Sequence, residues 1–281
     1  FEIELGWNKQ VGEVSFRVAG NASFIKNEVT LLGADKDYLP SRQTITPQSL
    51  EVTRVAVGQS VDSFFGYQTA GLFQNQADIN NYKNSAGALI QPNAKPGDIK
   101  FLDLNGDGLI SDADRTFLGR SNPNFTYGLT FSAKYKGFDV SIFGQGVSGN
   151  MIFNGLRRFD LSPSNYTTNI LNRWTGEGTS NTVPRATLAD ENKNYSRVSS
   201  LFLESGAYFR LKNVQLGYTL PKTLVNKVGI DNLKFYVMAN NLFTLTKYNG
   251  YDPEIGGGSL GVDRGFYPQA RSFFVGVNVG F

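Results

Sequence analysis

The feature that most constrains this sequence is a two-residue alternation of apolar and polar side chains. From Phe125 to Tyr135, every odd position is apolar or aromatic, and every even position is Thr, Gly, Ser or Lys. Successive side chains of a β-strand point to opposite faces, so this run predicts a strand with one apolar and one polar face. The two-residue turn Lys136-Gly137 leads into a second run from Phe138, which indicates a hairpin.

The same alternation predicts seven strands along the chain. They fall at residues 1–8, 14–24, 125–135, 138–145, 213–220, 233–240 and 271–281. A tilted strand needs about ten residues to cross a bilayer, and these runs are close to that length. The connections alternate between short ones, at 8–12, 136–137 and 221–232, and long ones, at 25–123, 149–207 and 246–270. Short periplasmic turns and long external loops are typical of outer-membrane β-barrels.

A soluble β-sandwich also has alternating strands, and it is the competing fold. The polar faces of these runs carry Gly, Ser, Asn, Thr and Lys, which suit a water-filled lumen and favour the barrel. If the short turns are periplasmic, the strands at 1–8 and 271–281 both run inward. Seven strands would leave two unpaired edges in lipid, so we expect the last seven strands of an even-stranded barrel. Residue 1 lies inside a strand pattern, so we also expect the chain to be a fragment.

Composition excludes several classes of protein. The chain has no Cys and no His, which removes thiol nucleophiles, disulfides, His-based triads and the usual zinc sites. Its 27 Lys and Arg and 24 Asp and Glu are spread along the chain, so no basic patch indicates nucleic-acid binding. No base, nucleophile or phosphate loop stands out, and we expect no enzyme activity.

Several short segments follow one another in a recognisable order between Gly66 and the C-terminus. They are Gly66-Tyr-Gln-Thr-Ala-Gly71-Leu-Phe73, Gly97-Asp-Ile-Lys-Phe101, Asp103-Leu-Asn-Gly-Asp-Gly108, Leu118-Gly-Arg-Ser-Asn-Pro-Asn-Phe125, Tyr135-Lys-Gly-Phe138-Asp-Val140, Asn172-Arg-Trp174, Pro184-Arg185, Tyr208-Phe-Arg-Leu-Lys-Asn-Val-Gln-Leu-Gly-Tyr-Thr-Leu-Pro221, Asn241-Leu-Phe243, Tyr251-Asp-Pro-Glu254 and Tyr267-Pro-Gln-Ala-Arg271, with the terminal Phe281. In this order they resemble the C-terminal part of SusC/RagA-type TonB-linked (TonB-dependent) outer-membrane transporters of Bacteroidetes. Residues 1–281 would then be the C-terminal part of the barrel domain, with 25–123 as a long extracellular loop region.

The resemblance implies a ~22-strand barrel in the cell outer membrane, whose plug and roughly fifteen further strands lie outside this chain. It implies active import of nutrients such as glycans, oligosaccharides or peptides. A SusD-like surface lipoprotein would cap the barrel, and the TonB complex would act on the plug. A passive porin or protein-export barrel is the alternative. A soluble β-sandwich that acts as a surface binding module is a further one.

The sharpest local motif runs from Asp103 to Asp114 and matches the calcium-loop template. The predicted ligands are Asp103, Asn105, Asp107, the carbonyl of Leu109, and Asp114, with Gly106 at the sharp turn. Asp114 stands where Glu is usual, and Asp112 is a spare ligand. The motif predicts a structural Ca²⁺ ion, and the alternative is an ion-free turn rich in Asp, Asn and Gly.

Aromatic residues give two further expectations. In the resembled barrels, a C-terminal aromatic on an alternating strand is the signal that the outer-membrane assembly machinery reads, and Phe273 and Phe281 fit it. Aromatic loop residues suit either sugar stacking or packing within the loops: Phe64, Phe65, Tyr67, Phe73, Tyr248, Tyr251, Phe266 and Tyr267. Six arginines suit either the lumen or ion pairs between loops: Arg120, Arg157, Arg158, Arg173, Arg185 and Arg271.

Overall fold

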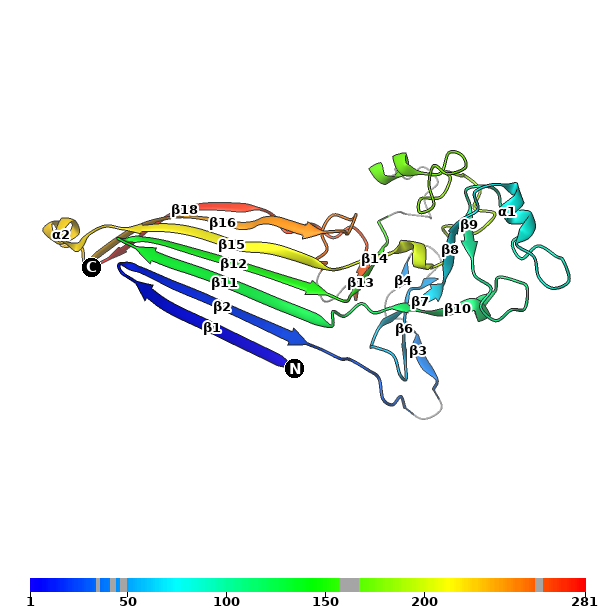
Figure 1. Ribbon diagram of the computed structural model, residues 1–281, viewed down its shortest axis with the longest axis horizontal. Coiled ribbons are helices and arrows are strands. Elements are labelled where there is room, and N and C mark those ends of the chain that lie inside the picture. The colour runs from blue at the N-terminus through cyan, green and yellow to red at the C-terminus, as the bar shows by residue number, and fades with distance from the viewer. Residues whose placement is uncertain (34–35, 41–43, 46–49, 157–166, 256–259) are drawn as a thin grey trace.

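The dominant element of the fold is one antiparallel sheet of seven long strands (Figure 1). The computed structural model describes residues 1–33, 36–40, 44–45, 50–156, 167–255 and 260–281. The strands neighbour one another in chain order. They are β1 (Glu2–Val11), β2 (Val14–Phe24), β11 (Phe125–Tyr135), β12 (Phe138–Ser148), β15 (Tyr208–Thr219), β16 (Asn232–Thr246) and β18 (Ser272–Gly280). Each overlaps one of the seven predicted runs, and they form a single sheet instead of the two packed sheets of a sandwich.

The first hairpin turn is shorter than the sequence predicts. Asn8 to Val11 continue β1 and pair with residues of β2 down to the pair Val11–Val14, so the turn is Gly12-Glu13 and not residues 8–12. The backbone ladder does not require apolar side chains, and this polar end of the strand therefore stays paired. Gly12 has φ +58°, the left-handed conformation that a two-residue hairpin turn needs.

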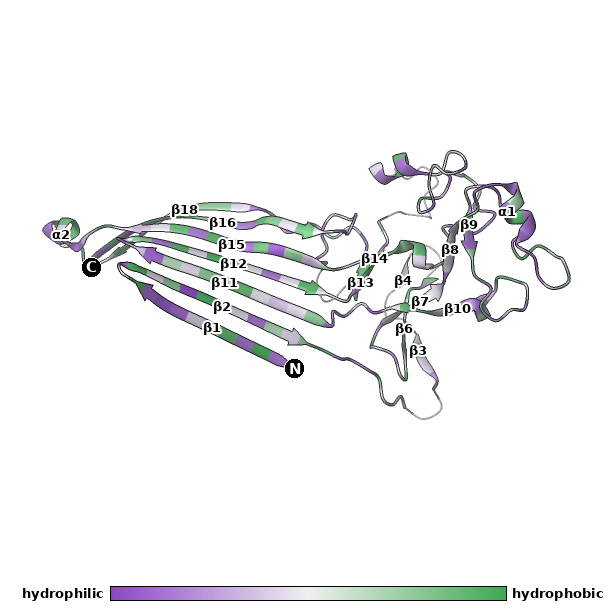
Figure 2. Ribbon diagram, viewed as in Figure 1, coloured by the Kyte–Doolittle hydropathy of each residue, from purple (hydrophilic) through white to green (hydrophobic). Residues whose placement is uncertain are grey.

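One face of the seven-stranded sheet, which we call the wall, is apolar and exposed. Leu216, Val237 and Val275 are neighbours across three strands, and they are 50%, 49% and 84% exposed. Figure 2 shows hydrophobic and hydrophilic bands alternating along these strands. An apolar face of this extent is the surface that a barrel presents to lipid.

The opposite face of the wall carries polar side chains. Lys234 forms an ion pair with Asp139 at 2.8 Å, and the amides of Asn213 and Asn240 hydrogen-bond at 2.9 Å. These contacts satisfy polar groups on the face that the alternation predicts to line the lumen.

All short turns lie at one end of the wall, and all long connections lie at the other (Figure 1). The connection between β15 and β16 contains α2 (Lys222–Val225) and the 3₁₀ turn η4 (Asn226–Val228). Among the described residues, no helix is long and apolar enough to span a membrane. The pattern of short and long connections predicted from the sequence is therefore present in the fold.

The described residues of the long connections, which span 25–124, 149–207 and 247–271, form a second folded unit that we call the loop domain. Its strands are β3 (Tyr38–Pro40), β4 (Thr44–Ile45), β5 (Leu50–Glu51), β6 (Thr53–Ala56), β7 (Ser63–Tyr67), β8 (Thr69–Leu72), β9 (Ile99–Phe101), β10 (Arg115–Gly119), β13 (Met151–Asn154), β14 (Leu203–Ser205) and β17 (Val262–Asp263). Its helical segments are α1 (Gln76–Asn81), η1 (Asp112–Asp114), η2 (Thr168–Asn172) and η3 (Ser200–Phe202).

The hydrophobic core lies in the loop domain. The largest cluster joins Val52 and Phe64 from the first connection to Phe153 and Val198 from the second and Val262 from the third. A second cluster surrounds Ile99 and Phe101, and a third surrounds Phe73 and Ile79. Burial of these side chains contributes roughly 1.5–3 kcal/mol each, so the loop domain has its own source of stability.

Candidate functional site

The first two long connections meet along an interface that depends on glycine. The Tyr67 amide donates to the carbonyl of Val198 at 2.9 Å, and a Cβ at Gly66 would overlap that carbonyl. The Leu72 amide donates to the side chain of Asn181 at 2.9 Å, and a Cβ at Gly71 would overlap the same amide group. The glycines of the Gly66–Gly71 motif therefore allow the two connections to pack against each other.

A buried ion pair closes the same interface. Asp98 is fully buried, and Arg185 from the second connection donates to it through Nε at 2.6 Å and Nη2 at 3.2 Å. Asn194 donates to the same carboxylate at 2.8 Å, and the Lys95 amide donates to it at 2.8 Å. Every oxygen of Asp98 is thus satisfied by groups that come from two distant segments. Of the six arginines, Arg185 therefore forms an ion pair between loops, whereas Arg157 and Arg158 lie outside the described residues.

The predicted calcium loop is a closed turn held by its own side chains. Asp103 accepts hydrogen bonds from the amides of Gly106 at 2.7 Å and Gly108 at 2.8 Å. Asp107 accepts one from the Leu109 amide at 2.9 Å. Asp114, which is fully buried, accepts amide hydrogen bonds from Leu104 and Ser111, both at 2.8 Å.

These bonds bear on the calcium prediction without testing it. Within the described parts of the chain, no three acidic side chains converge as a metal site. Carboxylate oxygens that accept one amide keep a second lone pair, so the turn does not block a cation. Calcium binding by Asp103, Asn105, Asp107, Leu109 and Asp114 stays a prediction.

Hydrogen bonds join the predicted calcium loop, Asp103 to Asp114, to the rest of the loop domain, and two of them involve Asp112 and Ile110. The Tyr67 hydroxyl donates to Asp112 at 2.8 Å, and Arg197 from the second connection donates to the Ile110 carbonyl at 3.0 Å. Burial, together with the hydrogen bond to the Asp112 carboxylate, raises the pKa of Tyr67 to about 12. Asp112 therefore orders the loop through a tyrosine, a role that its predicted use as a spare ligand did not include.

The third long connection is held against the lumen face of the wall by a charged cluster. Arg210 of β15 is only 3% exposed, and it forms ion pairs with Asp252 and, at 2.6 Å, with Glu254. Lys212 reaches Glu254 at 2.7 Å, and the Gln269 amide donates to Asp252 at 2.8 Å. Both ends of the connection are therefore attached to one strand. Arg210, Asp252 and Glu254 were not among the predicted site residues, although their motifs are visible in the sequence.

A β-bulge in β15 changes the direction of the Lys212 side chain, which belongs to this charged cluster. The pairing of β15 with β16 shifts register between Leu211 and Asn213, and Asn241 has φ +52°. The shift leaves Lys212 without a ladder partner, and the Asn241 side chain donates to the Ala270 carbonyl at 3.0 Å. Bulges commonly re-aim side chains in this way.

The predicted loop aromatics divide into two groups. Buried members pack within the loop domain, and they are Phe64, Phe65, Tyr67, Phe73 and Tyr248. Exposed members are Tyr251, Phe266 and Tyr267. Packing within the loops therefore accounts for five of the eight residues. Phe273 of β18 and Phe281, which directly follows β18, are 72% and 90% exposed, and their part in assembly stays a prediction.

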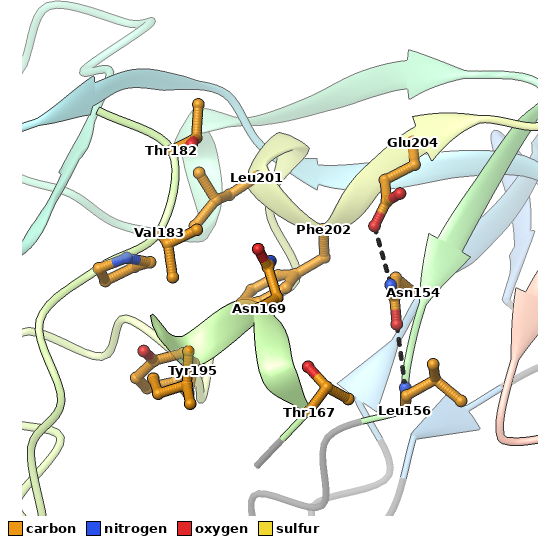
Figure 3. A pocket seen from close by; sticks show the side chains of 12 residues that line it. Asn154, Leu156, Thr167, Asn169, Thr182, Val183, Tyr195, Leu201, Phe202 and Glu204 are labelled. Carbon is orange, nitrogen blue, oxygen red and sulfur yellow. Dashed lines mark hydrogen bonds between the residues drawn. The ribbon is translucent and has the colours of Figure 1, made fainter. Parts of the chain in front are cut away.

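A cavity of about 140 Å³ lies beside β13, η2 and η3 (Figure 3). Its apolar side includes Leu201 and Phe202, and its one carboxylate is Glu204. Glu204 already accepts hydrogen bonds from Asn154 at 2.8 Å and from the Asn249 amide at 2.7 Å. Pockets for small ligands usually measure about 300–1,000 Å³, so this cavity is too small to hold a nutrient.

No family model matches the chain. It is 34% identical over 80% of its length to TonB-dependent receptor P3 of Formosa agariphila, and 26% identical over 93% of its length to TonB-dependent receptor SusC of Bacteroides thetaiotaomicron. It spans 22% and 24% of the lengths of those two relatives. Among solved structures, the RagAB peptide importer in its 'open-open' state matches all of the chain and 28% of the matched chain, with a TM-score of 0.73 and 22% identity.

An antiparallel wall with an exposed apolar face, short turns at one end and long loops at the other defines part of an integral outer-membrane β-barrel protein. Within that class, the sequence similarity decides the family. The chain belongs to the TonB-dependent receptors of the SusC/RagA type, as its motifs predict.

Proposed function

We propose that this chain supplies wall strands and the loop domain of an active importer of the outer membrane. The proposed cargo is a nutrient too large for simple diffusion through a porin, such as an oligosaccharide or a peptide. The single observation that carries the proposal is the 34% identity to a TonB-dependent receptor over 80% of the chain. No catalytic role is proposed for any residue.

The architecture supports a division of labour between the wall and the loop domain. The wall satisfies its backbone within the sheet and presents an apolar face for lipid. The loop domain has its own core, so it is a preorganised surface at the mouth of the barrel. We place the loop domain outside the cell and the turn with α2 in the periplasm, because outer-membrane barrels have short turns on the periplasmic side.

The proposal includes three partners. A SusD-like surface lipoprotein would cover the loop domain, because the chain is similar to the RagAB peptide importer and to SusC. The TonB complex would supply energy through a plug domain. The outer-membrane assembly machinery would read the last strand. Each partner is inferred from the family and is testable in the full-length protein.

Conductance separates active import from passive diffusion without knowledge of the cargo. The full-length protein would be reconstituted in planar bilayers, with a general porin as the matched control. A plugged importer should give no stable open-channel steps until the plug is removed or denatured, whereas the porin conducts at once. Stable steps from the untreated protein would contradict active import and favour the passive porin or export barrel.

Dependence on TonB gives a second readout in cells. Uptake of a candidate oligosaccharide or peptide mixture should stop when the tonB gene is deleted, and it should resume on complementation. Uptake that continues at the same rate without TonB would contradict the proposal, even if the protein lies in the outer membrane.

A further inference from the structure

The loop domain contains two adjoining hollows at the junction of its first two connections. They measure about 300 Å³ and 330 Å³, and both are lined by Ile110, Ser111, Lys193 and Arg197. The first is also lined by Tyr67, Arg115 and Ser196. Its volume falls at the lower end of the range for ligand pockets, which suits one sugar ring or one amino-acid residue of a longer chain.

Three cations line the first hollow, and they are held in different ways. The Arg197 guanidinium lies over the rings of Tyr67 and Phe101, 4.9 Å from each centroid, and it donates to the Ile110 carbonyl at 3.0 Å. Arg115 forms an ion pair with Glu51 at 3.2 Å. These contacts hold both guanidinium groups in place before any ligand arrives, which lowers the cost of binding.

Lys193 is the cation without a protein partner. Its side chain is exposed, and among the described residues its ammonium group takes part in no hydrogen bond or ion pair. Its backbone has φ +59°, a conformation that a lysine rarely adopts. Lys193 lines both hollows, so its charge is available where they meet.

The two acidic residues that line the first hollow already have cationic or hydroxyl partners. Glu51 forms ion pairs with both Arg54, at 2.6 Å, and Arg115. Asp112 accepts the hydrogen bond from the Tyr67 hydroxyl. Three cations thus face two carboxylates, and one of those carboxylates is shared with a fourth cation outside the hollow. The arrangement leaves positive charge next to the hydroxyl groups of Ser111 and Ser196.

We propose that this hollow binds a carboxylate group of the cargo, with Lys193 and Arg197 as the charged ligands. A guanidinium group and an ammonium group around hydroxyl donors are suited to a single planar anion. An acidic side chain of a peptide and a uronic acid of an oligosaccharide carry the same group. The identification of the ligand as cargo rests on the proposed import function, but the binding itself does not.

The test is calorimetric titration of the full-length protein in detergent. The probes are triglutamate and trigalacturonate, with triglutamine and maltotriose as neutral counterparts. Lys193→Gln removes the charge and keeps a polar side chain that is one atom shorter, and Lys193→Arg keeps the charge. Lys83→Gln is the matched control, because Lys83 is also exposed in the loop domain but lies outside both hollows.

An acidic probe should bind, and Lys193→Gln should weaken its binding about fivefold, the effect expected of one partly screened ion pair. Lys193→Arg and Lys83→Gln should bind as the unmodified protein does, and added salt should weaken binding in all of them. Binding of only one acidic probe would identify the source of the carboxylate and still support the site.

Two results would overturn the proposal. One is that neither acidic probe binds the unmodified protein. The other is that the Lys193→Gln and Lys83→Gln variants bind the acidic probe with equal affinity. Neither result affects the import function, which the TonB-dependence of uptake tests separately. Conversely, uptake that is independent of TonB would remove the import proposal and leave a measured carboxylate site intact.

Discussion

Replacement of Arg185 by Gln should open the loop domain while leaving the wall intact. Asp98 is fully buried, and Arg185 provides its only cationic partner among the described residues. Loss of one partner of a buried pair costs about 3–5 kcal/mol, because the remaining charge stays buried without compensation. Lys95 forms an exposed pair with Glu191, so Lys95→Ala should cost about 0–1 kcal/mol and is the matched control.

Hydrogen exchange measured by mass spectrometry on the full-length protein can follow this opening locally. Two amides bond across the interface: that of Ile99 donates to the Asn194 side chain, and that of residue 185 donates to the Gly97 carbonyl. Since each 1.36 kcal/mol is a factor of ten, about 3–5 kcal/mol corresponds to exchange that is about 10²- to 10³-fold faster or more.

Amides of β11 and β12 should keep their protection, because the wall ladder does not involve Asp98. The reasoning would be refuted if Arg185→Gln and Lys95→Ala exchanged alike, or if the wall and the loop domain opened together.

Four further predictions concern separate features. Arg210→Gln should release the third connection, because it leaves the carboxylates of Asp252 and Glu254 without this cationic partner, at a cost of about 3–5 kcal/mol in stability. Protease should then cleave between residues 249 and 270, and continued resistance would contradict the role of Arg210 in holding this connection. Ca²⁺ should slow exchange of amides 104–111, and Asp103→Asn should abolish the effect; equal exchange with and without Ca²⁺ would remove the calcium prediction. The Tyr67 pKa of about 12 lies above its usual 10.0, so its contribution to stability is complete below pH 10 and is lost as pH rises through 12. The tyrosinate absorbance of the protein minus that of Tyr67→Phe should show this late titration, and ionisation at the usual pH would contradict it. Phe281→Ala should lower the amount of barrel assembled in the outer membrane, whereas Phe274→Ala, on the opposite face, should not; equal assembly of both would argue against the signal.

The wall was predictable because its signal is local. Each strand has an apolar face that must meet lipid, so the two-residue period appears in the sequence itself, as it does from Phe125 to Tyr135. The motifs, in their order along the chain, also predict the family from the sequence alone. The alternation of apolar and polar residues does not predict the end of the β1–β2 hairpin, because polar residues continue the backbone hydrogen bonding between the two strands there.

The loop domain was not predictable in the same way, because its contacts join residues that are far apart in the sequence. Asp98 and Arg185 are separated by 87 positions, and neither position reveals its partner. The glycines at 66 and 71 resemble ordinary turn residues until their contacts with Val198 and Asn181 are seen. Lys193 carries no motif, so only the fold brings it to the hollow beside Arg197.

We propose that a lipid-facing wall carries the loop domain on the outside of the cell. The chain contains no Cys, so a single introduced cysteine can report on each end of the wall in a full-length protein whose other cysteines, if any, are replaced. Leu188 is 95% exposed in the loop domain, and Lys222 is exposed in α2 at the opposite end.

The decisive measurement is labelling of Leu188→Cys and Lys222→Cys by a membrane-impermeant maleimide. In intact cells, Leu188→Cys should react at once, whereas Lys222→Cys should react only after the outer membrane is permeabilised. Labelling of Lys222→Cys in intact cells, with Leu188→Cys protected, would reverse the orientation. Equal labelling of both in intact cells would contradict a membrane-spanning wall.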